Sequence, residues 1–174
     1  IDNNDKFYFF ILSFFPLALI LGNLIINIFI FLFFINFLIN FKKNLFFVKN
    51  IIIYLLGFFL LSLITNIFFS LNPENSLPRV IKIFFILLIA IETLRIFNKY
   101  NEKLISKIFF IWSLIISVVL FDCIFEIFFG FNTLGFSTTL TGRIASFFGD
   151  ELVVGAFVHG FAIVLLAYLV NQNV

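Results

Sequence analysis

Long apolar runs without a single charge dominate this chain, and the first of them covers the 35 residues from 7 to 41. One straight helix of that length would far exceed a hydrocarbon core of roughly 30 Å, because each residue adds about 1.5 Å. The run therefore has to break, and Gly22-Asn23 is the natural position, with Pro16 shortly before it. The pattern predicts two short helices, over about 7–22 and 24–41.

Four further apolar segments follow, each bounded by polar or turn-forming residues. The stretches that separate the segments are a basic loop at 42–49, a loop with two prolines at 72–78, a hydrophilic hairpin at 95–107 and a loop rich in Gly, Ser and Thr at 130–150. The additional predicted helices cover about 50–70, 79–97, 105–129 and 151–170. The expected fold is all-α, a polytopic transmembrane helix bundle of about six spans that forms a single domain over residues 1–174.

Composition also favours a membrane protein. Hydrophobic residues make up 63% of the chain and charged residues 11%, whereas soluble domains carry about a quarter charged residues. The net charge of +2 is too small to predict a nucleic-acid partner, and the single Cys123 makes neither an intrachain disulfide nor a metal site. We expect no metal and no cofactor. The chain starts at Ile1 and has no Met, so we also expect it to be a fragment.

Basic residues are distributed unevenly between the expected loops. The loops at 42–49 and 95–107 hold seven of the eleven Lys and Arg residues, whereas those at 71–82 and 130–150 hold three. Because basic residues concentrate on the cytoplasmic side, the first pair of loops is predicted to face the cytoplasm and the second pair the outside of a bacterial inner membrane.

An arginine followed by the start of a helix is the first candidate site. Arg143 lies in the expected outer loop, and Asp150 is a suitable N-cap for the last predicted helix. A guanidinium group and the free backbone amides of a helix N-terminus both bind phosphate, so a lipid-linked pyrophosphate fits this position. An interfacial arginine that pairs with Asp150 or with lipid headgroups is the other interpretation, and both remain open.

Charged side chains elsewhere form two further candidates. Asp122 and Glu126 are four residues apart, so they share a helix face and predict a polar cavity, a contact with a sugar hydroxyl or a pair with Arg143. For Glu126 a position among the headgroups is favoured. Arg79 and Lys82 lie at the outer start of a predicted helix, where they either hold an anionic group or extend to the headgroups.

The segment 122–155 resembles the bacterial O-antigen ligase and O-antigen polymerase family. The residues that carry the resemblance are Asp122, Gly130-Phe131-Asn132, Gly135 and Arg143-Ile144-Ala145-Ser146-Phe147-Phe148-Gly149-Asp150-Glu151-Leu152-Val153-Val154-Gly155. In that family a similar order of glycine, arginine and acidic residues leads into a transmembrane helix. The opening stretch 15–22 resembles the first helix of the same proteins.

This resemblance implies a membrane glycosyltransferase of GT-C-like architecture that needs no metal. Such proteins take a glycan from an undecaprenyl pyrophosphate carrier on the periplasmic side, and pass it to lipid A-core or to a growing chain. The expected partners are that carrier, lipid A-core and membrane lipid, and the expected substrate-binding residues are Arg143, Asp122, Arg79 and Asp150. Family members carry catalytic residues, in ligases a histidine, in a large periplasmic loop nearer their C-terminus, so this role is not assigned to His159.

Two other classes of protein remain open. A multi-pass transporter or lipid-glycan flippase is also built of apolar helices, but no internal repeat is found and the notable polar residues lie near the outer surface. A non-catalytic subunit of a membrane complex with a proton path would carry ionisable residues in the middle of several helices, and the longest apolar runs here contain none except His159.

Overall fold

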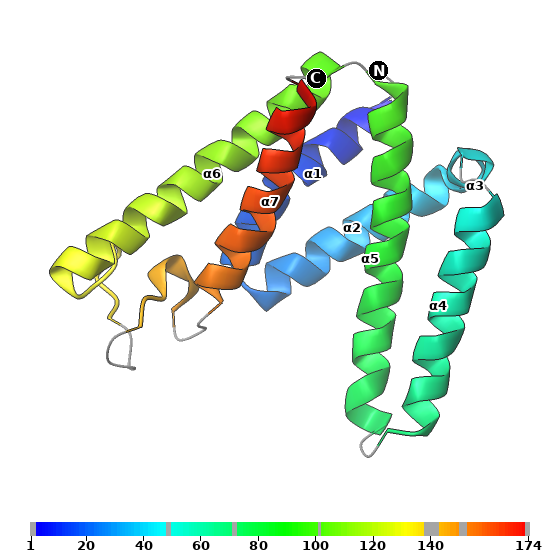
Figure 1. Cartoon of the computed structure of the whole chain (residues 1–174), viewed down its shortest axis with the longest axis horizontal. Helices are drawn as coiled ribbons and strands as arrows, with labels where there is room; N and C mark the ends of the chain where they lie inside the picture. The colour runs from blue at the N-terminus through cyan, green and yellow to red at the C-terminus, as the bar shows by residue number, and fades with distance from the viewer. Residues whose placement is uncertain are drawn as a thin grey trace. The chain divides into compact units, whose positions relative to one another are not determined.

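The computed structural model describes residues 3–47, 50–70, 73–100, 102–137, 143–149 and 153–172, and within these ranges it contains helices and loops but no strand. The elements are α1 (Asn3–Ile20), α2 (Asn23–Ile39), α3 (Phe41–Phe47), α4 (Asn50–Phe68), α5 (Pro73–Lys99), α6 (Glu102–Phe129), the short 3-10 helix η1 (Ser146–Phe148) and α7 (Val154–Gln172) (Figure 1). The predicted all-α class is confirmed.

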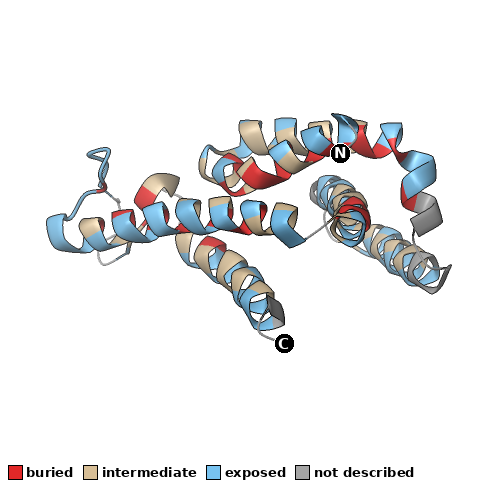
Figure 2. Cartoon of the chain, turned by 90° about the horizontal axis from the view of Figure 1, so that it is seen from above, coloured by how far each residue is buried: buried red, intermediate tan, exposed pale blue. Residues whose placement is uncertain are grey.

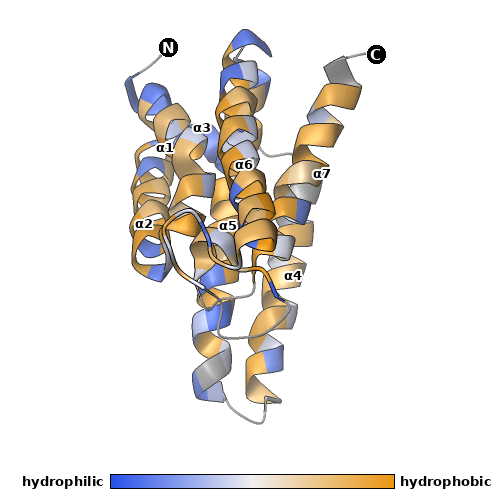
Figure 3. Cartoon of the chain, turned by 90° about the vertical axis from the view of Figure 1, so that its left-hand side faces the viewer, coloured by the Kyte–Doolittle hydropathy of each residue, from blue (hydrophilic) through white to orange (hydrophobic). Residues whose placement is uncertain are grey.

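Apolar side chains cover the outer faces of these helices as well as their contacts. Phe68, Phe69 and Phe128 are each more than three-quarters exposed, at 82%, 88% and 78%, and Figure 3 shows apolar colouring along much of the longer helices. Within the described part of the chain, α6 is the one helix that is both long and apolar enough to cross a membrane. Because contact between water and so large an apolar surface is unfavourable, these features indicate a membrane-associated chain.

The predicted break in the first apolar run is confirmed. Gly22 separates α1 from α2 and has a φ of +97°, a backbone conformation that is strained for residues with a Cβ atom. Pro16 does not interrupt the helix, because α1 continues through it to Ile20. The first run therefore forms two helices joined by only two residues.

The chain divides into two compact units. Unit 1 consists of Ile1–Ile11 and Asn27–Glu102, and unit 2 of Leu12–Ile26 and Lys103–Val174. Helices α1 and α2 each contribute residues to both units. Along the helices, buried residues form narrow stripes between exposed residues, as Figure 2 shows by colour.

A buried carboxylate organises one end of unit 1. Asp5 is fully buried, and its two oxygens accept hydrogen bonds from Arg95 Nη2 at 2.9 Å, from Lys99 Nζ at 2.7 Å and from the Tyr100 hydroxyl. Burial raises the pKa of Asp5, but the hydrogen bonds from Lys99, Tyr100 and Arg95 outweigh this effect and hold the pKa at about 2. Asp5 is therefore ionised at neutral pH, and it ties the start of α1 to the end of α5.

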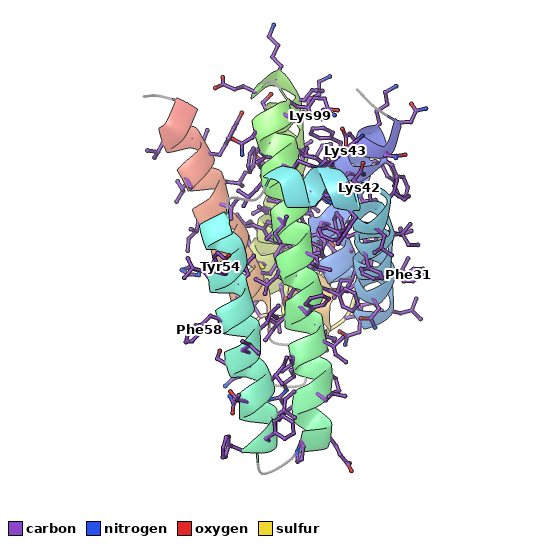
Figure 4. All side chains as sticks on the ribbon, turned by 90° about the vertical axis from the view of Figure 1, so that its right-hand side faces the viewer. Phe31, Lys42, Lys43, Tyr54, Phe58 and Lys99 are labelled. Carbon is purple, nitrogen blue, oxygen red and sulfur yellow. The ribbon has the colours of Figure 1, made fainter. Side chains whose placement is uncertain are left out.

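Arg95 also connects this end of α5 to the short helix α3. Its Nε donates a hydrogen bond to Asn44 Oδ1 at 2.6 Å, and its Nη2 lies 3.5 Å from Glu92 Oε1. Lys42, Lys43 and Lys99 lie at the same end of unit 1 (Figure 4). The placement of the stretches 42–49 and 95–107 on one side of a membrane stays a prediction.

Helices extend into two stretches that were expected to be loops. Residues 41–47 form α3, because the stretch has neither Gly nor Pro and exposes Lys42 and Lys43 while it buries Asn44. Helix α5 begins at Pro73 and runs through Pro78, although two prolines were expected to prevent a helix there. Proline fits the first turn of a helix, where its missing N–H has no helical partner to lose, and Pro78 removes only one bond near this end.

Unit 2 packs α6 against α7 and against the second half of α1. Its buried centre is formed by Ile116, Val119 and Phe157. The Trp112 ring meets Phe161 edge to face at 5.1 Å between centroids. These apolar contacts hold α6 against α7, and the candidate site lies beyond them at the end of α6.

Trp112 also satisfies the one carbonyl that Pro16 leaves without a helical donor. In an α-helix the Leu12 carbonyl would accept the N–H of the residue four positions later, and that residue is Pro16, which has no N–H. The Trp112 indole Nε1 donates to the Leu12 oxygen instead, at 2.9 Å and in a buried position. This bond explains how a proline is accommodated inside α1.

We expect the Trp112→Phe substitution to lower the free energy of unfolding by about 1–3 kcal/mol, because the Leu12 carbonyl then stays buried without a donor. The Pro16→Ala substitution supplies the missing N–H, so the cost of Trp112→Phe should become much smaller in a Pro16→Ala background. Unfolding midpoints of the four proteins in mild detergent measure this coupling. An equal cost of Trp112→Phe in both backgrounds would show that Trp112 contributes packing alone.

Candidate functional site

Two buried carboxylates lie one turn apart near the end of α6. Asp122 is fully buried, and Glu126 is only 6% exposed. The expectation that Glu126 lies among lipid headgroups is therefore wrong, because the segment after α6 folds back over both side chains. Two carboxylates at this spacing repel each other unless donors neutralise them, so their partners define the site.

Asp122 accepts hydrogen bonds from both sides of the loop that follows α6. Its Oδ1 accepts the Thr133 backbone N–H at 2.8 Å and the Thr133 hydroxyl at 2.6 Å. Its Oδ2 accepts the Ser146 hydroxyl at 2.6 Å. One carboxylate thus joins two positions that are thirteen residues apart in the sequence.

Glu126 holds the far end of the same loop through backbone amides. Its Oε2 accepts the Ser146 N–H at 2.7 Å and the Ala145 N–H at 3.2 Å. Ser146 has a φ of +51°, which is uncommon for a residue with a Cβ atom. Hydrogen bonds to a charged acceptor are strong enough to maintain such a backbone conformation.

Asn132 completes the arrangement at the near end of the loop. Its Oδ1 accepts the N–H groups of Phe136 at 2.8 Å and of Leu134 at 3.1 Å, which closes a tight turn. Its Nδ2 donates to the Ser146 carbonyl at 2.8 Å. The turn and the Ser146 segment are therefore tied to each other as well as to α6.

Arg143 lies two residues before this anchored segment and is exposed. Residues 138–142 and Asp150 are outside the described part of the chain, so the predicted N-cap of the last helix is not placed. The hydrogen bonds of the loop to Asp122 and Glu126 fix the backbone close to the exposed guanidinium group. Asp122 and Glu126 accept several hydrogen bonds from the protein itself, which suits them to holding the loop. Within the described residues, no group of three or more His, Cys, Asp or Glu side chains is arranged to hold a metal ion.

The other residues singled out from the sequence lie elsewhere. Arg79 and Lys82 are exposed on α5 and belong to unit 1, whereas Arg143 belongs to unit 2. His159 is exposed on α7 and does not contribute to the described core.

Sequence reasoning identified the two carboxylates but not their partners. Asn132 and Ser146 were noted only as part of a family resemblance, and the structure makes both of them central to the loop. A signal for Asn132 was present, since an Asn shortly after a helix-ending glycine often organises a turn through its side-chain oxygen. The backbone amides of Ala145 and Ser146 have no sequence signature at all.

Comparison with protein-family models, with curated proteins and with solved structures finds no match to this chain. The chemistry of the site is therefore judged from its geometry.

We expect Asp122→Ala and Glu126→Leu each to release the loop from α6. Every bond to a charged acceptor contributes about 1.5–3 kcal/mol, so amide hydrogen exchange in residues 131–149 should become at least about tenfold faster. Ser117→Ala is the matched control, because Ser117 is exposed on the same helix and donates only to the Ser113 carbonyl. Unchanged exchange in both carboxylate variants would mean that other contacts hold the loop.

Proposed function

We propose that this chain is a multi-pass inner-membrane helix bundle of about six spans. The proposal is supported by the shorter apolar segments Asn23–Ile39, Tyr54–Phe68 and Val154–Val170, which accompany α6. Tyr54, Phe58 and Phe31 point away from their own helices and are 76%, 74% and 60% exposed (Figure 4). In a bilayer these side chains meet lipid or neighbouring helices instead of water.

We further propose that the chain belongs to a glycosyltransferase of the O-antigen ligase or polymerase type. It would act on an undecaprenyl-pyrophosphate-linked glycan at the periplasmic face. The observation that carries this proposal is the buried pair of Asp122 and Glu126, which fixes the loop next to Arg143. The residues of this network lie within the segment 122–155 on which the family resemblance depends.

The proposed reaction transfers a sugar with inversion at its anomeric carbon. An acceptor hydroxyl attacks that carbon and releases its proton to water, while the bond to the pyrophosphate oxygen breaks and the pyrophosphate leaves with the electron pair and a developing negative charge. Arg143 stabilises this charge as an electrostatic clamp and transfers no proton. A clamp of this kind needs a fixed position, and the hydrogen bonds of Asp122 and Glu126 to the loop supply one.

The proposed membrane arrangement predicts opposite locations for two groups of residues. In a Cys123→Ala background, a cysteine at position 43 should react from the cytoplasm, and cysteines at positions 74 and 137 should react from the outside. A membrane-impermeant maleimide, applied to intact and to lysed cells, measures this difference. Labelling of all three positions from one side, or recovery of the protein in the soluble fraction, would contradict the multi-pass arrangement.

The proposed transfer predicts that Arg143→Ala in the full-length protein lowers glycan transfer by at least about a hundredfold, since one electrostatic contact to a transition state is lost. Arg143→Lys should recover little, because an ammonium group lacks the planar fork that binds phosphate in pairs of hydrogen bonds. The lipopolysaccharide ladder on a gel measures transfer, and immunoblotting of membranes measures insertion.

Lys103→Ala is the control for the loss of a positive charge, and it should leave the ladder intact. A wild-type ladder from Arg143→Ala would contradict the proposed role of Arg143 as a clamp, and would favour a transporter, a flippase or a non-catalytic subunit.

A further inference from the structure

A small polar cavity lies between α4 and α5. It is close to the end of the helix pair at which α4 ends with Phe68 and α5 begins with Pro73. The two helices lie side by side in unit 1 (Figures 1 and 4). The cavity has a volume of about 190 Å³ and is lined by four aliphatic side chains together with Asn66, Ser76 and Arg79. It is the combination of a cation and two neutral hydrogen-bonding groups that distinguishes it from the apolar surroundings.

Arg79 has no partner among the residues that the structure describes. No hydrogen bond or ion pair links its guanidinium group to them, and no carboxylate is among the described residues that line the cavity. Arg95, the other arginine of α5, has its charge matched by Asp5 and Glu92. Arg79 is exposed, so its guanidinium group is accessible from outside the cavity, and such a group binds phosphate oxygens through several N–H donors.

The position of Arg79 along α5 agrees with the depth of a lipid headgroup. Arg79 and Lys99 are 20 residues apart on one continuous helix, which corresponds to roughly 30 Å, the thickness of a hydrocarbon core. With Lys99 at one surface of the bilayer, Arg79 lies at the level of the phosphate groups in the opposite leaflet.

The neutral groups of the cavity complement a phosphate oxygen. The Asn66 amide offers two N–H donors, and a serine hydroxyl donates or accepts. The Ser76 hydroxyl is held at 2.7 Å from the Ser70 hydroxyl, which fixes its position at the cavity wall. The aliphatic lining suits the glycerol and the first carbons of a lipid chain.

We propose that this cavity binds the phosphate group of an anionic phospholipid from the outer leaflet, with Arg79 as its main ligand and Asn66 as a second donor. The same chemistry fits free phosphate, and the aliphatic lining favours the lipid. The site does not depend on glycan transfer, because Arg79 and Arg143 belong to different units.

The test measures binding of phosphatidylglycerol to the full-length protein in mild detergent by native mass spectrometry. We expect Arg79→Gln to weaken binding about tenfold, which corresponds to the loss of one charge-assisted contact. Lys82→Gln is the matched control, since Lys82 carries the same charge one turn away but does not line the cavity. The affinity of the Lys82→Gln variant for phosphatidylglycerol should change by less than about twofold if a specific site, and not overall charge, holds the lipid.

A second variant keeps the test decisive where Arg79→Gln disturbs folding. Asn66→Ala leaves the charge unchanged, and it should weaken binding about threefold or more, with the helical circular dichroism preserved. Equal loss in Arg79→Gln and Lys82→Gln would overturn the proposal in favour of diffuse attraction. Displacement of the lipid by millimolar inorganic phosphate would also overturn it, and would assign the cavity to a free anion.

Discussion

A polar group that is buried among apolar side chains must find its partner within the protein, and this constraint accounts for the arrangement of both units. In unit 1 the Asp5 carboxylate collects donors from the end of α5. In unit 2 the Asp122 and Glu126 carboxylates collect donors from the loop after α6. The Leu12 carbonyl, deprived of its helical donor by Pro16, is paired by an indole N–H from another helix. Apolar packing brings these helices together without much specificity, and the polar pairs determine which positions face each other.

The course of the helices could be predicted from the sequence wherever charge and glycine delimit an apolar run. The break at Gly22 is an example, because the run was too long for one helix and only glycine suits the turn. The prediction was wrong for 42–47, where lysines suggested a loop, and for the stretch from Pro73 to Pro78, where prolines suggested an interruption. The two stretches have different explanations. Asn44 is paired with Arg95 from α5, and Pro73 occupies a first turn that requires no N–H.

For the candidate site, sequence reasoning could place Asp122 and Glu126 on one helix face, since a spacing of four determines this. It could not assign their roles, because a carboxylate that binds a ligand and one that holds a loop have the same spacing. The difference lies in the donors, and most of these are backbone N–H groups or small hydroxyls such as those of Thr133 and Ser146. Such donors become recognisable only when the fold brings them within hydrogen-bonding distance.

The two-residue connection between α1 and α2 has a consequence for biogenesis. Leu21 and Gly22 carry no charge and offer no polar loop that would remain at a membrane surface. The two helices are about 27 Å and 25 Å long, so neither alone reaches across a typical hydrocarbon core with length to spare. In the proposed multi-pass arrangement, both segments would therefore enter the bilayer together as a helical hairpin, in which α1 and α2 already make contacts such as Tyr8 with Phe33. The order of synthesis would then assemble this part of the bundle before the later helices leave the translocation channel.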